Sequence, residues 1–218
     1  MIGNRKVSEL EEKNTFYLPT FAYIIYLITY RMADFLQFCN EFSPLDEAAK
    51  DELFKNLKTK TVKKGQYLLK TGEVCRHLFF INEGLAKLFF IKDGKEFINV
   101  FGVENRLFSA FESYLTQTPS NFNLIALEPT TVTLISYTDM ERLCKKHHCM
   151  ETFFRKLVSI AATKMTRRIS EMLEENATKR YNQFVKENKQ ILQRISLGDL
   201  ASYLGITQQS LSRIRAKK

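Results

Sequence analysis

Several features that mark specialised classes of protein are missing from this chain of 218 residues. Its four cysteines are scattered and cannot form the dense disulfide framework of a small secreted protein, so a reducing cytoplasm is the expected location. The sequence contains no phosphate-binding glycine loop, no nucleophile elbow and no zinc-protease helix. We therefore do not expect an enzyme.

Long apolar runs are also missing, apart from one near the N-terminus that is too short to cross a membrane. It covers residues 16–30 and is interrupted by Pro19. As a helix this run would extend about 22 Å, whereas the core of a bilayer is about 30 Å thick. No small-residue cleavage site of a signal peptide follows it. We expect residues 1–31 to be an upstream extension outside the fold, a working protein that starts near Met32, and no membrane partner; the alternative is a membrane tether.

Acidic residues are outnumbered by basic ones, and the imbalance is concentrated at the C-terminal end. The whole chain carries a formal net charge of +9, while apolar content of 44% and charged content of 26% are ordinary for a globular protein. Residues 176–218 contain nine basic and two acidic residues. This distribution is typical of a nucleic-acid-binding module. The alternative is an ordinary solvated surface.

The middle of the chain has the pattern of a compact β structure. Residues 60–136 contain short apolar, β-branched and aromatic runs separated by glycines. Asp93-Gly94 lies between two such runs and predicts a two-residue hairpin turn. Short strands at this spacing favour a barrel or sandwich, here of jelly-roll type. With the helical segments around it, the expected fold class is α+β.

A long helix is predicted after the β region. Apolar residues recur every three or four positions from Met150 to Met172, and residues 157–162 are apolar nearly all round. A helix of this kind must be covered on two sides, by the β domain and by the same helix of a second subunit. The alternative is a core helix within one chain. The predicted homodimer interface consists of Phe154, Leu157, Ala161, Met165 and Ile169.

The last 23 residues have the pattern of a helix-turn-helix. Ser196, with Asp199 three residues later, resembles a capping box that starts the first helix. Gly205 suits the left-handed conformation of a tight turn, and Thr207 is a favourable N-cap for the second helix. Ala201, four residues before the glycine, allows the two helices to approach closely. The expected apolar contacts are made by Leu200, Leu204, Ile206, Leu211 and Ile214.

The exposed face of the second helix is predicted to contact double-stranded DNA. Arginine can hydrogen-bond guanine with two donors and glutamine can do the same with adenine, so Gln208, Gln209 and Arg213 are expected to read bases. The remaining candidates are hydroxyl and basic side chains, of which four are assigned to phosphates and Arg215 is left open. The four are Thr207, Ser210, Ser212 and Lys217.

Five short motifs, three in the β region and two in the helix-turn-helix, match the pattern of one known family. They are Lys64-Gly65-Gln66, Thr71-Gly72-Glu73, residues 78–84, residues 200–207 and residues 211–215. Through these motifs the chain resembles the Crp/Fnr regulators over residues 40–218. The resemblance implies a cyclic-nucleotide-binding-like β-roll (32–148), a dimerisation helix (149–175) and a helix-turn-helix domain (176–218), after the extension 1–31. It also implies RNA polymerase as a partner, and residues 177–215 look most like members from Bacteroidetes-type bacteria.

Two departures from the family pattern concern ligands. Members that bind cyclic AMP have a Gly-Glu pair and an Arg-Ser or Arg-Thr pair, where this chain has Ser109-Ala110 and Ser120-Asn121. Without the arginine a buried phosphate lacks its partner, so we expect no appreciable cyclic AMP binding. Residues at the family's ligand positions are mostly apolar and favour an uncharged effector or none. They are Phe101, Leu107, Phe108, Ser109, Ala110, Phe111, Ser120, Asn121 and Phe122.

No metal or cofactor is expected. Oxygen-sensing members hold an iron–sulfur cluster with closely spaced cysteines, whereas Cys39 stands alone in the N-terminal region. The segment from Cys144 to Cys149 includes two histidines, but its spacing is not that of a known zinc site.

The function expected from these observations is a dimeric, sequence-specific transcription regulator that binds a near-palindromic DNA site. The alternative is a small-molecule sensing module with a vestigial DNA-binding end. Family members continue beyond the second helix into a β-hairpin wing, whereas this sequence ends at Lys218, so the domain is expected to lack most of the wing.

Overall fold

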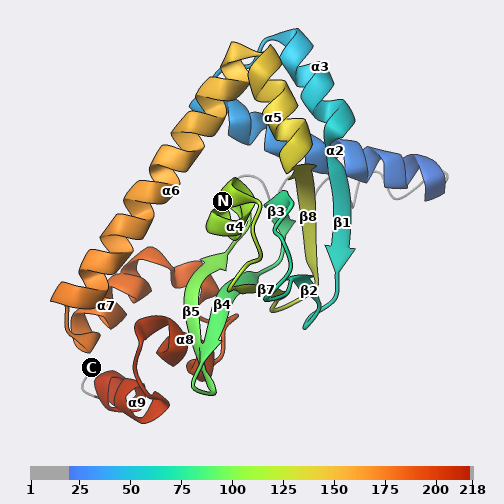
Figure 1. The fold of residues 1–218 in the computed structure, drawn as a ribbon. Helices are drawn as coiled ribbons and strands as arrows, with labels where there is room; N and C mark the ends of the chain where they lie inside the picture. The colour runs from blue at the N-terminus through green and yellow to red at the C-terminus, as the bar shows by residue number, and fades with distance from the viewer. Residues whose placement is uncertain (1–19, 217–218) are drawn as a thin grey trace.

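The protein folds into a β-roll with helices on one face and a helical C-terminal unit at its lower end (Figure 1). The computed structural model describes residues 20–216, and the side chains of residues 30–216. Two antiparallel sheets, in the orders β1-β8-β3-β6 and β2-β7-β4-β5, form the roll and confirm the predicted α+β class. The strands are β1 (Lys58–Val62), β2 (Tyr67–Leu69), β3 (His77–Glu83), β4 (Ala86–Lys92), β5 (Lys95–Gly102), β6 (Arg106–Phe108), β7 (Asn123–Ala126) and β8 (Thr130–Ser136).

The predicted hairpin turn is confirmed. β4 and β5 pair antiparallel up to Lys92 opposite Lys95, so Asp93 and Gly94 form the two-residue loop. Both have positive φ, 51° and 71°. This geometry matches the right-handed twist of the strands, and a glycine adopts it readily.

Aromatic packing joins the helices to the outer face of β3. Helix α2 (Thr20–Phe42) places Phe35 and Phe38 against Phe80 of β3, with centroid distances of 5.4 Å for both pairs. Phe153 of α6 (His148–Glu174) meets the rings of Phe35 and Phe38 edge-on. Helices α3 (Glu47–Asn56), α4 (Phe111–Thr116) and α5 (Tyr137–Lys146) complete this part of the chain.

The N-terminal boundary expected near Met32 falls inside helix α2. Met32 is itself buried in the core, and Arg31 accepts a hydrogen bond from the Asn82 side chain through its backbone carbonyl. The described part of residues 1–31 thus continues into the folded chain, while residues 1–19 lie outside the described residues. No helix within residues 20–216 is long and apolar enough to cross a membrane.

Helix α6 (His148–Glu174) connects the roll to the C-terminal unit and runs as a long diagonal in Figure 1. The C-terminal unit lies beside the β4–β5 hairpin at the end of this helix. It consists of α7 (Ala177–Glu187), a short 3-10 helix (Lys189–Ile191), α8 (Leu197–Leu204) and α9 (Gln208–Ala216).

Candidate nucleic-acid interface

Local hydrogen bonds define the two helices of the predicted helix-turn-helix. Ser196 accepts a hydrogen bond from the backbone N–H of Asp199 (2.9 Å), and the Asp199 carboxylate accepts one from the Ser196 N–H (3.3 Å), so the predicted capping box starts α8. Gly205 ends α8 in the left-handed conformation, with φ of 67°. The Thr207 hydroxyl then accepts from the N–H of Ser210 (3.2 Å) and caps α9. All three predicted caps are confirmed.

Small and apolar side chains hold α8 and α9 together. Ala201 is 2% exposed and Leu204 and Leu211 are fully buried. A larger side chain at Ala201 would separate the helices because the interior is closely packed. Ile206 and Ile214 are half-buried at the rim of this contact.

Helix α9 presents a polar and basic face to solvent. Thr207, Ser210 and the base-reading candidates all lie on α9 or at its start. Thr207 and Ser210 also serve the helix cap, since their hydroxyls are 3.0 Å apart. Lys217 lies outside the described residues. The exposed candidates are Thr207, Gln208, Gln209, Ser212, Arg213 and Arg215.

Two arginines counted in the basic C-terminal segment have structural partners instead of a free surface. Arg180 donates through Nε (3.2 Å) and Nη2 (3.0 Å) to the backbone carbonyl of Leu204, at the end of α8. Arg194 pairs with the carboxylates of Glu104 (2.6 Å) and Glu128 (2.5 Å) on the roll. Charge counting alone missed these roles because it ignores where each side chain ends.

Arg168 of α6 was not singled out by the sequence, yet it orients α8. Its guanidinium lies over the ring of Tyr203, 4.0 Å from the centroid, and donates to the Tyr203 carbonyl. Cation–π contact of this kind is attractive because the ring face is electron-rich. An arginine among the apolar positions of a long helix was the available signal for this contact.

A family model and several solved structures are similar to this chain. Residues 59–147 match the family model of the cyclic nucleotide-binding domain. The structure is similar to FixK2 from Bradyrhizobium japonicum, with 19% sequence identity, a TM-score of 0.63, and coverage of 74% of this chain and 83% of that chain. A search of the curated proteins finds no match.

Two further solved structures share the arrangement. One is a protein from Eubacterium rectale assigned to the Crp/Fnr family of transcriptional regulators, with 19% identity, a TM-score of 0.63, and coverage of 78% and 82% of the two chains. The other is the catabolite activator protein of Thermus thermophilus, with 16% identity, a TM-score of 0.52, and coverage of 81% and 84%. The protein has the Crp/Fnr fold.

Phe101 does not line the interior of this Crp/Fnr roll, contrary to its predicted place in an effector pocket. Its ring packs against Tyr203 (5.5 Å between centroids) and Phe184 (6.1 Å) of the C-terminal unit. The reason is strand alternation: Phe101 pairs with Lys87, and both side chains point to the outer face of the sheet, toward α8.

The other predicted pocket residues surround β6 and α4 of the Crp/Fnr roll. Ser109 is 3% exposed and donates to the carbonyl of His77 (3.0 Å), and its oxygen lies 3.2 Å from the sulfur of Cys75. Ser120 is 4% exposed and accepts from the N–H of Phe122 (3.0 Å). Both hydroxyls therefore have partners within the chain. Phe108 and Ala110 are buried, Leu107, Phe111 and Phe122 are half-buried, and Asn121 is exposed.

The histidine-containing segment after α5 has an ion-pairing role. Nε2 of His147 lies 2.9 Å from a carboxylate oxygen of Glu52, which also pairs with Lys146 (2.7 Å). Hydrogen bonds from these two side chains lower the pKa of Glu52 to about 2. The described residues contain no group of three or more His, Cys, Asp or Glu side chains that could hold a metal ion.

The predicted dimer residues on α6 fall into two groups. Leu157 is 7% exposed and Phe154 is half-buried, and both pack into the core of their own chain. Met165 and Ile169 are 51% and 59% exposed, and Ala161 is half-buried between the two groups. The chain itself therefore buries apolar residues in the first half of α6 and leaves those in the second half exposed to solvent.

Proposed function

We propose that the protein is a sequence-specific DNA-binding transcription regulator. The observation that carries the proposal is helix α9, which is capped, packed on α8 through Leu211, and exposed along its polar and basic face. A recognition helix of this form enters the major groove with its N-terminal residues against base edges. RNA polymerase is the partner that the family resemblance implies, and the cytoplasm is the expected location.

Gln208, Gln209 and Arg213 are assigned to bases, and Thr207, Ser210, Ser212 and Lys217 to phosphates. Supporting this division, Gln208 and Gln209 occupy the first turn of α9 and Arg213 lies about one and a half turns later. Arg215 extends from the last turn, where a phosphate of the flanking backbone is its expected contact.

We propose further that the regulator is a parallel homodimer formed through α6. Its open side carries apolar residues at alternating spacings of four and three, the pattern of a two-stranded coiled coil. These residues differ from the dimer interface predicted from the sequence, because Phe154 and Leu157 pack in the core of their own chain. Two copies would present their recognition helices to a near-palindromic site. The seam consists of Val158, Ala162, Met165, Ile169 and Met172.

We propose that cyclic AMP is not the effector. The positions where cyclic-AMP-binding members carry a phosphate-binding pair are Ser120 and Asn121, and the Ser120 hydroxyl is bonded to its own loop. An unpaired phosphate in such a place would be unfavourable. The mainly apolar side chains of β6 and α4 favour an uncharged effector, or none.

Selection from a random duplex library tests the proposed function. The full chain should enrich a near-palindromic sequence, and Arg213→Ala should abolish preference for that sequence while non-specific binding remains. One lost bidentate contact corresponds to about 1–3 kcal/mol of discrimination. The matched control is Arg76→Ala, an exposed arginine on the roll.

Two results would contradict the proposal. Enrichment of no sequence would favour a sensing module with a vestigial DNA-binding end. Unchanged preference in Arg213→Ala, equal to that of Arg76→Ala, would refute the assignment of Arg213 to a base.

A further inference from the structure

The helix-turn-helix and the β-roll share one hydrophobic core. Leu85, Phe89, Ile98 and Phe101, from the β4–β5 sheet and the residue before it, are buried together with side chains of the C-terminal unit. Those side chains are Phe184, Ile191, Leu200, Ala201, Leu204 and Leu211. The outer face of β4–β5 thus covers the apolar side chains of the DNA-reading unit, and the two parts are packed through a common core.

Lys87 of β4 forms the first ionic contact across this interface. Its ammonium lies 2.7 Å from a carboxylate oxygen of Asp199 and 2.6 Å from one of Glu96. The side chains of Lys87 and Asp199 are only 12% and 14% exposed. The Asp199 carboxylate also completes the capping box of α8 with Ser196, so this pair ties the start of that helix to the sheet.

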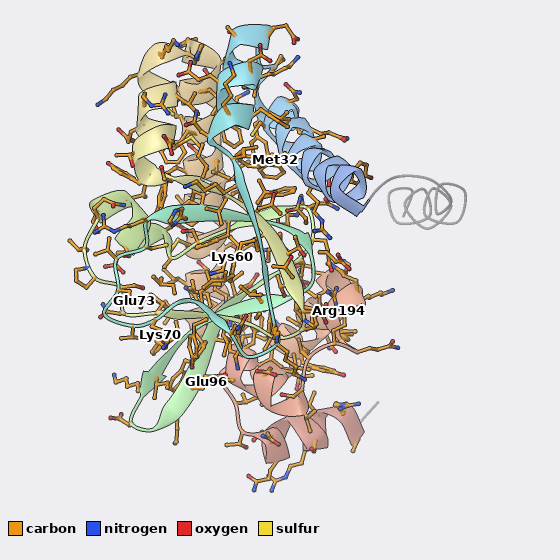
Figure 2. The ribbon with its side chains drawn as sticks, turned by 90° about the vertical axis from the view of Figure 1, so that its right-hand side faces the viewer. Met32, Lys60, Lys70, Glu73, Glu96 and Arg194 are labelled. Carbon is orange, nitrogen blue, oxygen red and sulfur yellow. The ribbon has the colours of Figure 1, made fainter. Side chains whose placement is uncertain are left out.

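Arg194 forms the second ionic contact, with two other carboxylates of the roll. It reaches Glu104, after β5, with two donors (2.6 and 3.1 Å) and also reaches Glu128, before β8. Figure 2 shows Glu96 on the sheet and Arg194 on the C-terminal segment, apart from each other in this view. Two contacts separated in this way resist rotation of the unit, which a single contact would allow.

The docking leaves the recognition helix open. Gln208, Gln209 and Arg213 are exposed, and α9 lies at the lower end of the molecule, near the tip of the β4–β5 hairpin (Figure 1). Tyr203 completes the connection, because it contacts Phe101 of the roll on one side and Arg168 of α6 on the other. The roll, the dimer helix and the DNA-reading unit therefore meet at one aromatic side chain.

We infer that the outer face of β4–β5 is a positioning surface for DNA recognition, on which Lys87 and Glu104 of the roll fix the angle between the helix-turn-helix and α6. This inference rests on the proposed dimeric, DNA-binding function. In a dimer, that angle sets the separation and rotation of the two recognition helices. Lys87 and Glu104 therefore determine which half-site spacing the protein accepts, although neither touches DNA.

The test varies half-site spacing in the sequence that the full wild-type chain selects. Adding or removing one base pair rotates one half-site by about 35°, because B-DNA has about 10.3 base pairs per turn. The wild-type protein should lose about tenfold or more in affinity at the altered spacings, as expected when both modules cannot bind together. Fluorescence anisotropy with the spacing series measures this profile.

The test variant is Lys87→Met combined with Glu104→Gln, both on the roll, with no change in net charge. Removing the ammonium leaves Asp199 and Glu96 facing each other, and Arg194 keeps Glu128 as its one ion-pair partner among the two carboxylates of the roll. We expect the variant to lose only about threefold or less in DNA affinity at the altered spacings, since a loosely held helix-turn-helix can adapt to a longer or a shorter spacing. The matched control is Lys92→Met with Glu112→Gln, exposed residues on the roll.

A conservative variant separates positioning from general damage. Lys87→Arg keeps a cation at the interface, so this variant should show most of the wild-type dependence of affinity on spacing. A variant that is merely unfolded would lose DNA affinity at every spacing. If Lys87→Met with Glu104→Gln does not fold, Glu104→Gln alone, which keeps an acceptor for the Gly84 N–H, takes its place in the same assay.

Four results would overturn the inference. The variant and the wild type could show the same spacing profile, or the wild type could bind all spacings equally, and in both cases the proposed function survives. If the wild-type chain selects no DNA sequence, the proposed function fails and the inference fails with it. Higher affinity of the variant at the selected spacing would show that docking opposes DNA binding, which also overturns the inference.

Discussion

Replacing Phe101 with alanine should destabilise the protein at the junction between the roll and the DNA-reading unit. Phe101 is 9% exposed, and its ring contacts Tyr203 and Phe184 at centroid distances of 5.5 and 6.1 Å. Truncation removes these contacts and leaves a cavity between two rigid layers, which typically lowers the free energy of unfolding by about 3–5 kcal/mol. For a chain of this size the midpoint of thermal unfolding should fall by about 10 °C.

Thermal and denaturant unfolding measure the overall loss, and hydrogen exchange shows where it occurs. In Phe101→Ala, the amides of α8 should exchange faster because the roll no longer covers that helix. Phe97→Ala is the matched control, because Phe97 lies on the same strand but stacks on Phe90 (5.2 Å) away from the shared core. A change in unfolding free energy below about 1 kcal/mol, with α8 protected as in the wild type, would refute the shared core.

Three further predictions concern acidity, the turn and the ligand. Burial raises the pKa of Asp199 and of Glu104, but hydrogen bonds from Lys87 and Ser196 to Asp199, and from Arg194 to Glu104, outweigh it and hold both pKa values below normal. Stability from these carboxylates is therefore present at neutral pH and lost as pH falls below about 4, a loss that urea titrations should show and that should be smaller in Glu104→Gln. Gly205→Ala should lower stability by more than about 1 kcal/mol, because φ is 67° and an added Cβ would lie 2.8 Å from the Met172 methyl carbon; equal stability in denaturant unfolding would contradict the left-handed turn. Calorimetric titration with cyclic AMP should give no binding heat and leave DNA affinity unchanged, whereas micromolar binding would disprove the assignment of Ser120 and Asn121.

Local features of the fold could be predicted from the sequence because they depend on neighbours in the chain. The Asp93-Gly94 turn, the Ser196–Asp199 capping box and the Gly205 turn each follow from backbone preferences of a few adjacent residues. Strand β1 (Lys58–Val62) has a weak signal in the sequence because four of its five residues are polar. Its position is decided by pairing with β8, whose residues lie 68 to 76 positions away along the chain.

The docking of the two domains could not be predicted in the same way. Lys87 and Asp199 are separated by 112 residues, and neither has a local pattern that identifies the other as its partner. For the same reason Phe101 was assigned to the interior of the roll and Arg194 to the DNA footprint. Leu157 was assigned to a dimer seam because periodicity shows that a helix face is apolar, while the structure shows what covers it.

In the proposed complex, two copies of α9 read one duplex. Hydroxyl-radical footprinting of the full chain on its selected sequence shows whether both copies bind. We expect two symmetric protected regions, with centres one helical turn apart, about 34 Å, and preference lost in Arg213→Ala. A single protected region, or protection without sequence preference, would contradict it.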